Sequence, residues 1–285
     1  MTFATAETID LPTLETIRDR LSERVAQGAL HLPVLPKAAG QILALAGDPN
    51  SDVAQLSALI HGDQALASHV LRIVNSAAYG GSQTIVSLQQ AVTRIGMKLL
   101  GEIAIAVSVR GEVFHVPGFQ AEIKRLWRHS LASGAWAKEI ARAKRTNVEC
   151  LFLCGLLHAI GKPIALRAVV ELEPGIDKNS ALALMDEFHG EVGAAVADKW
   201  RLPPQVRASC AYYRNRAAAA AFQKETAITW LSDRLASWVL LPGCPRDEAL
   251  GQDPVLAELN LYPEEFQALL DQQESVLATI HTMDA

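Results

Sequence analysis

The chain has 285 residues, of which half are hydrophobic and a fifth are charged, and its formal net charge is −5. This composition excludes an intrinsically disordered chain, and the length suffices for one large domain or two small ones with a sizeable core. The mildly acidic balance argues against a surface that coats DNA or RNA, because such surfaces carry a basic excess. We therefore expect no nucleic-acid partner.

The sequence gives no sign of export or membrane insertion. Residues 1–10 lack a basic stretch followed by an apolar one, so they do not read as a secretory signal. The longest apolar stretches are interrupted by Arg, Glu, Lys or Gly well short of a membrane span. Cys150, Cys154, Cys210 and Cys244 form no C-x-x-C pair. We predict a cytoplasmic protein without a membrane span, with Cys150 and Cys154 packed on one helix face.

Helical periodicity dominates the N-terminal part, and no stretch alternates with the period of two that a half-buried strand requires. A first helix is predicted from Leu14 to Gln27, before an extended stretch at Leu32–Pro36 where two prolines forbid regular helix. Asp52 and Asp63 are good N-caps, and Gly80-Gly81 is interpreted as a turn rather than a phosphate cradle. Helices are predicted at 37–46, from 52, from 63, at 87–100 and at 102–113.

The C-terminal part follows a break in the pattern at His115–Gly118, where Pro and Gly predict a boundary. The alanine run Ala217–Ala221 suits a helix. Beyond the boundary, helices are predicted at 121–143, 148–158, 180–200, 204–216, 224–240 and 263–280. The sequence therefore predicts an all-α protein with two helical lobes.

Three of the eight histidines stand apart because of their positions. His129 lies in a helix rich in tryptophan, His158 closes the apolar segment Leu151–Leu157, and His189 lies in a further predicted helix. A histidine at the end of an apolar helix needs a hydrogen-bond partner or a metal, because burying it unpaired is costly. Inward-facing residues of separate helices converge in a bundle, and Asp233 is one carboxylate that could join them. This pattern predicts a histidine-rich pocket in the second lobe.

Specific motifs extend this interpretation. The segment Gly155-Leu-Leu-His-Ala-Ile-Gly-Lys162 resembles the signature G-L-L-H-D-I-G-K of HD-type metal phosphohydrolases. The N-terminal lobe resembles the HDOD family, a group of HD-related output domains in bacterial signalling. This resemblance is carried by Leu32-Pro-Val-Leu-Pro36, Ile60-His-Gly-Asp-Gln-Ala-Leu66, Leu71-Arg-Ile-Val-Asn-Ser-Ala77 and Ile85-Val-Ser-Leu-Gln-Gln-Ala-Val-Thr-Arg-Ile-Gly96.

The resemblance covers roughly residues 28 to 240 and implies an organisation. It implies an N-terminal helix at 1–27, an HDOD N-terminal helical lobe at 28–117, and an HD-like helical bundle with a C-terminal helix at 118–285. Because it takes up most of the chain, we expect the input signal to come from a separate protein or a ligand.

Four positions match ligands of the HD-type enzymes. The resemblance places the first histidine ligand on His129, the histidine of the His-Asp pair on His158, and a later histidine on His189. It places the last aspartate on Asp233. These four residues are the expected binding residues of a degenerate HD pocket.

Two other positions depart from the enzyme pattern. The aspartate of the His-Asp pair falls on Ala159, and a further histidine falls on Tyr212-Tyr213. A methyl group offers no ligand, and tyrosine is protonated at neutral pH and substitutes poorly for imidazole. A two-metal clamp is therefore not expected, although the four matching residues could in principle hold a single Zn²⁺ or Fe²⁺. We expect no catalytic residue, no bound metal and no cofactor.

These features lead to three hypotheses, because fold alone does not fix function. The first is a non-catalytic signalling module that binds a partner protein or a small ligand. The second is a metal-dependent phosphohydrolase for a nucleotide or cyclic dinucleotide, with a depleted site. The third is a nucleotide receptor that uses the degenerate pocket, for which guanidinium and ammonium groups are suited to phosphate. Candidate cations near the pocket are Lys124, Arg125, Arg128, Arg142, Lys144 and Arg145.

Overall fold

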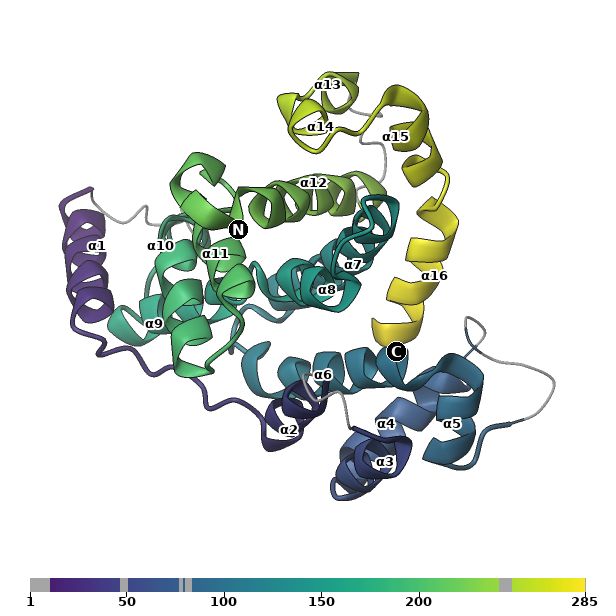
Figure 1. The fold of residues 1–285 in the computed structure, drawn as a ribbon. Helices are drawn as coiled ribbons and strands as arrows, with labels where there is room; N and C mark the ends of the chain where they lie inside the picture. Colours follow the sequence, from purple (N-terminus) through teal and green to yellow (C-terminus); the bar gives the residue numbers. More distant parts are fainter. Residues whose placement is uncertain (1–10, 47–50, 77–78, 80–83, 241–247, 285) are drawn as a thin grey trace, which may run out of the picture.

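The computed structural model describes residues 11–46, 51–76, 79, 84–240 and 248–284, and every regular element in these ranges is helical (Figure 1). The first elements are α1 (Leu11–Ala26), α2 (Lys37–Ala46), α3 (Val53–His61), α4 (Gln64–Val74), α5 (Leu88–Ile95) and α6 (Met97–Val113). The next are α7 (Gln120–Ala143), α8 (Val148–Leu157), α9 (Gly161–Leu172), α10 (Lys178–Lys199), α11 (Pro204–Tyr212), the 3₁₀ helix η1 (Arg216–Phe222) and α12 (Gln223–Leu240). The last are α13 (Glu248–Gly251), α14 (Pro254–Glu258), α15 (Pro263–Leu270) and α16 (Gln273–Asp284). The predicted all-α class is confirmed.

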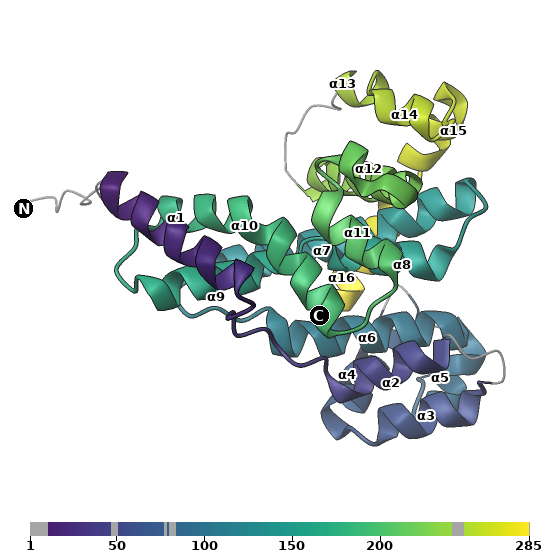
Figure 2. The same ribbon diagram turned by 60° about the vertical axis from the view of Figure 1, so that its left-hand side comes forward.

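Helices α2 to α5 pack on one another and against α6, which lies on the side of this N-terminal lobe that faces the rest of the molecule (Figures 1 and 2). Its centre includes the fully buried side chains of Ile60 from α3, Val70 from α4 and Leu100 from α6. The predicted N-caps are present: Asp52 accepts a hydrogen bond from the Gln55 amide and Asp63 from the Leu66 amide. Each cap satisfies an amide that the first turn of a helix leaves without a partner.

Helices α7 to α12 form the second lobe, with α7 in contact with α8, α12 and α16. The fully buried Trp136 lies at its centre. Among the cysteines, Cys154 and Cys210 are buried in this core and Cys150 is half-buried. The Gly80-Gly81 turn and Cys244 lie outside the described residues.

Two segments tie the lobes together from opposite ends of the chain. Helix α1 packs on α9 and α10 through Ile17 and Leu21, both buried (Figure 2). The stretch that follows is held by the end of α10, where Lys199 donates to the Leu32 carbonyl at 2.8 Å and Trp200 Nε1 to the Pro33 carbonyl at 2.9 Å.

At the other end of the chain, α16 packs against α7 and α6. Arg110 donates to the carbonyl of Asp284 at 3.1 Å, and the Asp284 side chain lies 3.6 Å from Arg128 Nε. The chain that leads into α2 is thus attached to the bundle, and α16 joins the bundle to α6. The boundaries predicted near residues 27 and 117 fall between α1 and α2 and between α6 and α7, and the division into domains stays a prediction.

Several helices differ from the sequence prediction, and the short α13 and α14 were not predicted. The helix expected at 87–100 ends at Ile95, because Gly96 has a φ of 83° that no continuing helix permits, and α6 then runs unbroken through Gly101. Helix α9 was not predicted at all. Its Pro163 falls in the first turn, where a missing amide hydrogen costs nothing, so this proline does not break the helix.

The C-terminal half differs in three further places. Helix α11 ends at Tyr212 rather than near residue 216. The alanine run forms a 3₁₀ helix with a kink at Ala220, whose φ is 47°, instead of an α-helix. The single helix expected at 263–280 is divided into α15 and α16, and the turn between them lets α16 pack against α6 and α7.

Within the residues that the structure describes, one helical stretch is long and apolar enough to cross a membrane by length and composition alone. Val148–Leu172 comprises 25 residues, and 78% of its apolar window is buried inside the protein. Burial of this kind is typical of core helices.

The side chain of Asn75, at the end of α4, forms hydrogen bonds that join α4 to Ile85, which precedes α5. Its Nδ2 donates to the carbonyls of Leu71 at 2.9 Å and Ile85 at 2.8 Å, and its Oδ1 accepts from the Ile85 amide at 2.7 Å.

We expect Asn75→Ala to lower the free energy of unfolding by about 2–4 kcal/mol, because it removes these bonds and leaves backbone groups without partners. Urea denaturation followed by circular dichroism measures this. Thr93→Ala, which removes one exposed bond to the Gln89 carbonyl in the same lobe, is the control, and equal losses in both variants would contradict the role of Asn75.

Candidate functional site

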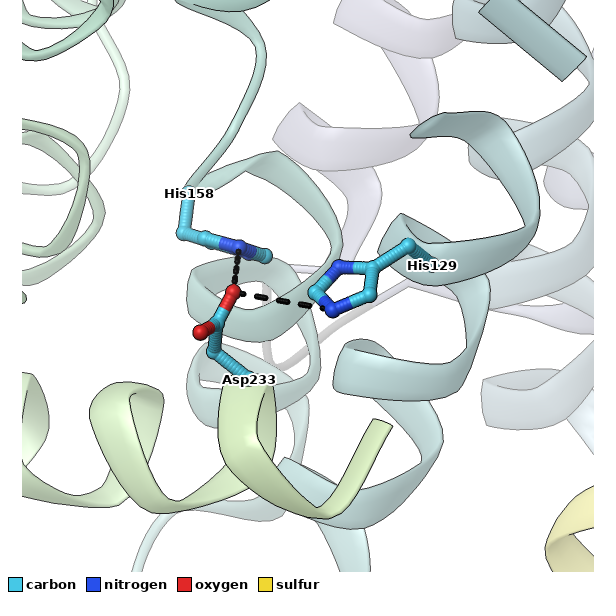
Figure 3. Close-up of side chains that lie close together, drawn as sticks. All are labelled: His129, His158 and Asp233. Carbon is cyan, nitrogen blue, oxygen red and sulfur yellow. Dashed lines mark hydrogen bonds and ion pairs between the residues drawn. The ribbon is translucent and has the colours of Figure 1, made fainter. Parts of the chain in front are cut away.

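Three of the four expected pocket residues meet where α7, α8 and α12 approach one another (Figure 3). His129 comes from the middle of α7, His158 caps the C-terminus of α8, and Asp233 comes from α12. The helices come this close because Gly155 has no side chain. A Cβ there would lie 2.4 Å from the Ser133 carbonyl oxygen of α7.

Asp233 lies between the two imidazoles. Its Oδ1 is 3.1 Å from His158 Nε2 and 3.7 Å from His129 Nε2, and the latter nitrogen also lies 3.0 Å from Ser237 Oγ. One ligand atom from each of His129, His158 and Asp233 lies within 4.8 Å of the others. Within the described residues, this is the group of His, Cys, Asp and Glu side chains that could hold a metal ion.

The hydrogen bonds of His158 define what must lie between it and Asp233. Its ring is fully buried, and Nδ1 lies 2.7 Å from the Gly155 carbonyl oxygen. A carbonyl only accepts, so Nδ1 carries a hydrogen and Nε2 faces the carboxylate of Asp233. A proton or a cation must therefore lie between Nε2 and Oδ1, because two acceptors 3.1 Å apart repel each other.

The electrostatics of the site keep Asp233 ionised. Burial by itself raises the pKa of Asp233, but the hydrogen bond from His158 and the positive charges beside it, including that of Lys162, hold it well below its usual range. Burial lowers the pKa of His129 to about 4, against the opposing effect of Asp233. The cluster thus presents an anionic oxygen beside a neutral imidazole at neutral pH.

The fourth expected residue, His189, is separated from this group by Tyr213. The Tyr213 ring is buried and packs edge-on against both imidazoles, with centroid distances of 4.8 Å to His158 and 5.8 Å to His189. The Nδ1 of His189 donates to the Asp186 carbonyl at 2.8 Å. The sequence left Tyr212 and Tyr213 open as alternatives for the departing position, and the residue beside the histidines is Tyr213.

Sequence reasoning missed a charged network on the α9 and α11 side of the site. Lys162 lies 2.8 Å from Asp186, which is also 3.6 Å from Arg214. Arg214 Nε donates to the Tyr213 hydroxyl at 3.1 Å. Lys162 is the last residue of the segment that resembles the HD-type signature, and this position could have indicated that it lies near the site. Arg214 had no such signal beyond its place next to Tyr213.

Several of the cations that the sequence singled out lie beside oxygen acceptors. Arg125 pairs with Glu122 at 3.0 Å, and Lys144 donates to the Asn260 carbonyl at 2.8 Å. Arg128 faces Asp284, as described above. These contacts reduce the charge that the cations would offer to a phosphate.

The residues do not fit a two-metal centre. Ala159, at the position of the enzymes' shared carboxylate, is buried and offers only a methyl group. Burial raises the pKa of Tyr213, so its phenol stays protonated and is a poor ligand. The three remaining donors fit one divalent cation, since two imidazole nitrogens, a carboxylate oxygen and water can complete a tetrahedral site.

His189 should make stability depend on pH. It is 5% exposed, and burial, with the charge of Arg214, lowers its pKa from 6.5 to about 4. Between these values the unfolded chain binds a proton and the folded chain does not, so stability is lost as the pH falls from 6.5 to 4. The loss is about 3 kcal/mol for this residue. We expect His189→Gln to flatten the pH profile of the unfolding free energy over this range, measured by urea titrations. Parallel profiles for both proteins would show that His189 takes up its proton equally in both states.

Comparisons with known proteins agree with this architecture. A crystal structure of a Shewanella amazonensis SB2B protein, provisionally named a metal-dependent phosphohydrolase, superposes with a TM-score of 0.71 at 22% identity, covering 95% of this chain and 100% of that one. An HDOD domain protein of unknown function from Geobacter sulfurreducens gives a TM-score of 0.71 at 22% identity over 96% of this chain and 98% of that one. At these identities the likeness shows the fold alone.

At the sequence level, an uncharacterized protein of Treponema pallidum (strain Nichols) is 27% identical over 214 residues, which are 71% of this chain and 41% of that protein. This chain therefore spans about two-fifths of the relative's length. The model of the HDOD domain family matches residues 32–216, most of the chain, and confirms the resemblance drawn from the motifs. The chain belongs to the HDOD domain family.

Proposed function

We propose that the chain is a non-catalytic, cytoplasmic signal-transduction module that acts by binding a partner protein or a small ligand. The observation that carries the proposal is Ala159. A buried methyl group stands where the HD-type signature has a carboxylate, directly after His158. A two-metal phosphohydrolase needs both ions to stabilise the attacking and leaving oxygens, and a shared carboxylate holds such ions together.

Tyr213 gives independent support. Its ring packs against His158 and His189 and fills the space between them. Its hydroxyl is engaged by Arg214. Opening this space for a substrate phosphate next to the imidazoles would require moving a side chain that is 1% exposed. The pocket is therefore arranged as a packed polar core more than as a substrate cleft.

The second candidate is a hydrolase with one metal ion. The observation in its favour is the convergence of His129, His158 and Asp233. A single bound ion would supply a Lewis acid and lower the pKa of a bound water. The residues of the chain would hold it through the two Nε2 atoms and Oδ1, with the Gly155 carbonyl fixing the orientation of His158.

The test is metal content and turnover of protein purified without chelator or affinity-tag metal. We expect sub-stoichiometric Fe, Mn and Zn by inductively coupled plasma mass spectrometry, and no hydrolysis of bis(p-nitrophenyl) phosphate in added Mn²⁺. The double variant Ala159→Asp/Tyr213→His, which restores both departing positions, should gain at least about tenfold in Mn²⁺ affinity.

Stoichiometric metal that is lost in His158→Ala, together with turnover by the unaltered protein, would contradict the proposal and favour the second candidate. Circular dichroism of each variant checks that the fold is intact.

A further inference from the structure

A cavity lies between the two lobes, beside the first half of α8. It has a volume of about 370 Å³ and lies between α2, α3 and α6 on one side and the start of α8 on the other. We name it the junction cavity. Its apolar wall includes Ile42, Leu45, Leu56, Ile105, Phe152 and Leu153. Concave, mostly apolar spaces of a few hundred Å³ with a few polar groups are the usual form of small-molecule sites.

Gly101 of α6 helps to keep this space open. A glycine inside a helix is destabilising relative to alanine, so its presence needs a reason. Close packing is not the reason, since a Cβ at this position would meet only Ile42 Cγ2 at 3.5 Å, an ordinary contact. Any side chain longer than that of alanine would extend along the wall of the cavity that Gly101 borders.

Three of the six polar residues that line the cavity are acidic, and the other three are Ser51, Lys98 and Asn147. Asp52, Glu102 and Glu149 border it, together with one ammonium group, that of Lys98, which pairs with Glu149. Lys138 pairs with Glu102. Three carboxylates thus stand against two ammonium groups, which leaves one negative charge in excess.

Glu102 is the buried member of this set, with 6% of its surface exposed. Burial raises the pKa of Glu102, and the charge of Lys138 opposes the rise. A second cation beside this carboxylate would further offset the cost of burying its charge. The chemistry of the cavity therefore favours a cationic ligand over a neutral or anionic one.

We propose that the junction cavity binds a small molecule with an apolar body and one basic nitrogen. The nitrogen pairs with Glu102, and the apolar body packs against the side chains of α2 and α8. Such a ligand touches the N-terminal lobe through α6 and the bundle through α8, whose C-terminal cap is His158. The site is separate from the histidine cluster and does not depend on whether that cluster is catalytic.

The probes are three compounds with one skeleton, 4-phenylbutylamine, 4-phenylbutanol and 4-phenylbutanoate, titrated into the full chain by isothermal titration calorimetry. We expect the amine to bind at least tenfold more tightly than the other two. Gly101→Leu, which fills the cavity, and Glu102→Gln, which removes the charge, should each weaken amine binding at least tenfold. Gly111→Leu is the matched control, because it places the same side chain on the exposed face of α6, where a Cβ meets nothing within 4 Å.

The proposal is overturned if the alcohol or the carboxylate binds as tightly as the amine, if none of the three binds, or if Gly101→Leu leaves amine binding unchanged. Circular dichroism and the melting temperature establish that the leucine variants fold. His158→Ala separates the two proposals, since it should leave amine binding intact whatever its effect on metal. Loss of amine binding in His158→Ala would place the ligand in the histidine cluster and overturn the junction site.

Discussion

The close packing of α8 against α7 is the constraint on which the histidine cluster depends. Gly155 allows the two helices to approach until a Cβ would lie 2.4 Å from the Ser133 carbonyl and 2.8 Å from Ala137 Cβ. That approach sets His158 deep in the bundle, where Asp233 of α12 can reach it. A side chain at Gly155 would force the helices apart and separate the imidazole from the carboxylate.

Gly161, at the other end of the same motif, has the same role for the next pair of helices. A Cβ there would lie 2.0 Å from the His189 carbonyl oxygen of α10. The segment 155–162 therefore connects α8 to α9 and packs closely against α7 at Gly155 and against α10 at Gly161. Its apolar residues and glycines serve this packing, whereas His158 and Lys162 interact with the polar groups of the site. This explains how the fold tolerates Ala159, because a buried methyl group removes a ligand and leaves both contact points unchanged.

The sequence predicted the fold well where periodicity and capping act locally, and less well where backbone geometry decides. The Asp52 and Asp63 caps follow from single residues, and the structure has both. The end of α5 depends on the positive φ of Gly96, while Gly101, an equally plausible stop in the sequence, lies inside α6. A glycine signals a possible break, and only the packing around it determines which glycine is used.

The same limit applies to the site. Family motifs indicated His129, His158 and Asp233, which come from three helices and do meet. They also indicated His189, which the structure places on the far side of Tyr213. Sequence spacing gives no information on what stands between two residues of a bundle. The network of Lys162, Asp186 and Arg214 was missed for this reason, since its members come from three different segments and form one unit only after folding.

The two ends of the chain determine how a change in one lobe reaches the other. Helix α1 and the stretch after it pack on α9 and α10, and α16 packs on α6 and α7, so a displacement of either lobe strains these contacts. Helix α6 also contacts the bundle directly, through the pair of Glu102 with Lys138 of α7, through Phe114 against Trp127 of α7, and through its packing on α8, where the cavity lies. Closely packed protein transmits small displacements with little loss, whereas an open space absorbs them. The packed contacts of α6 with α7 and α8 are therefore the direct route by which a displacement of the N-terminal lobe reaches the bundle.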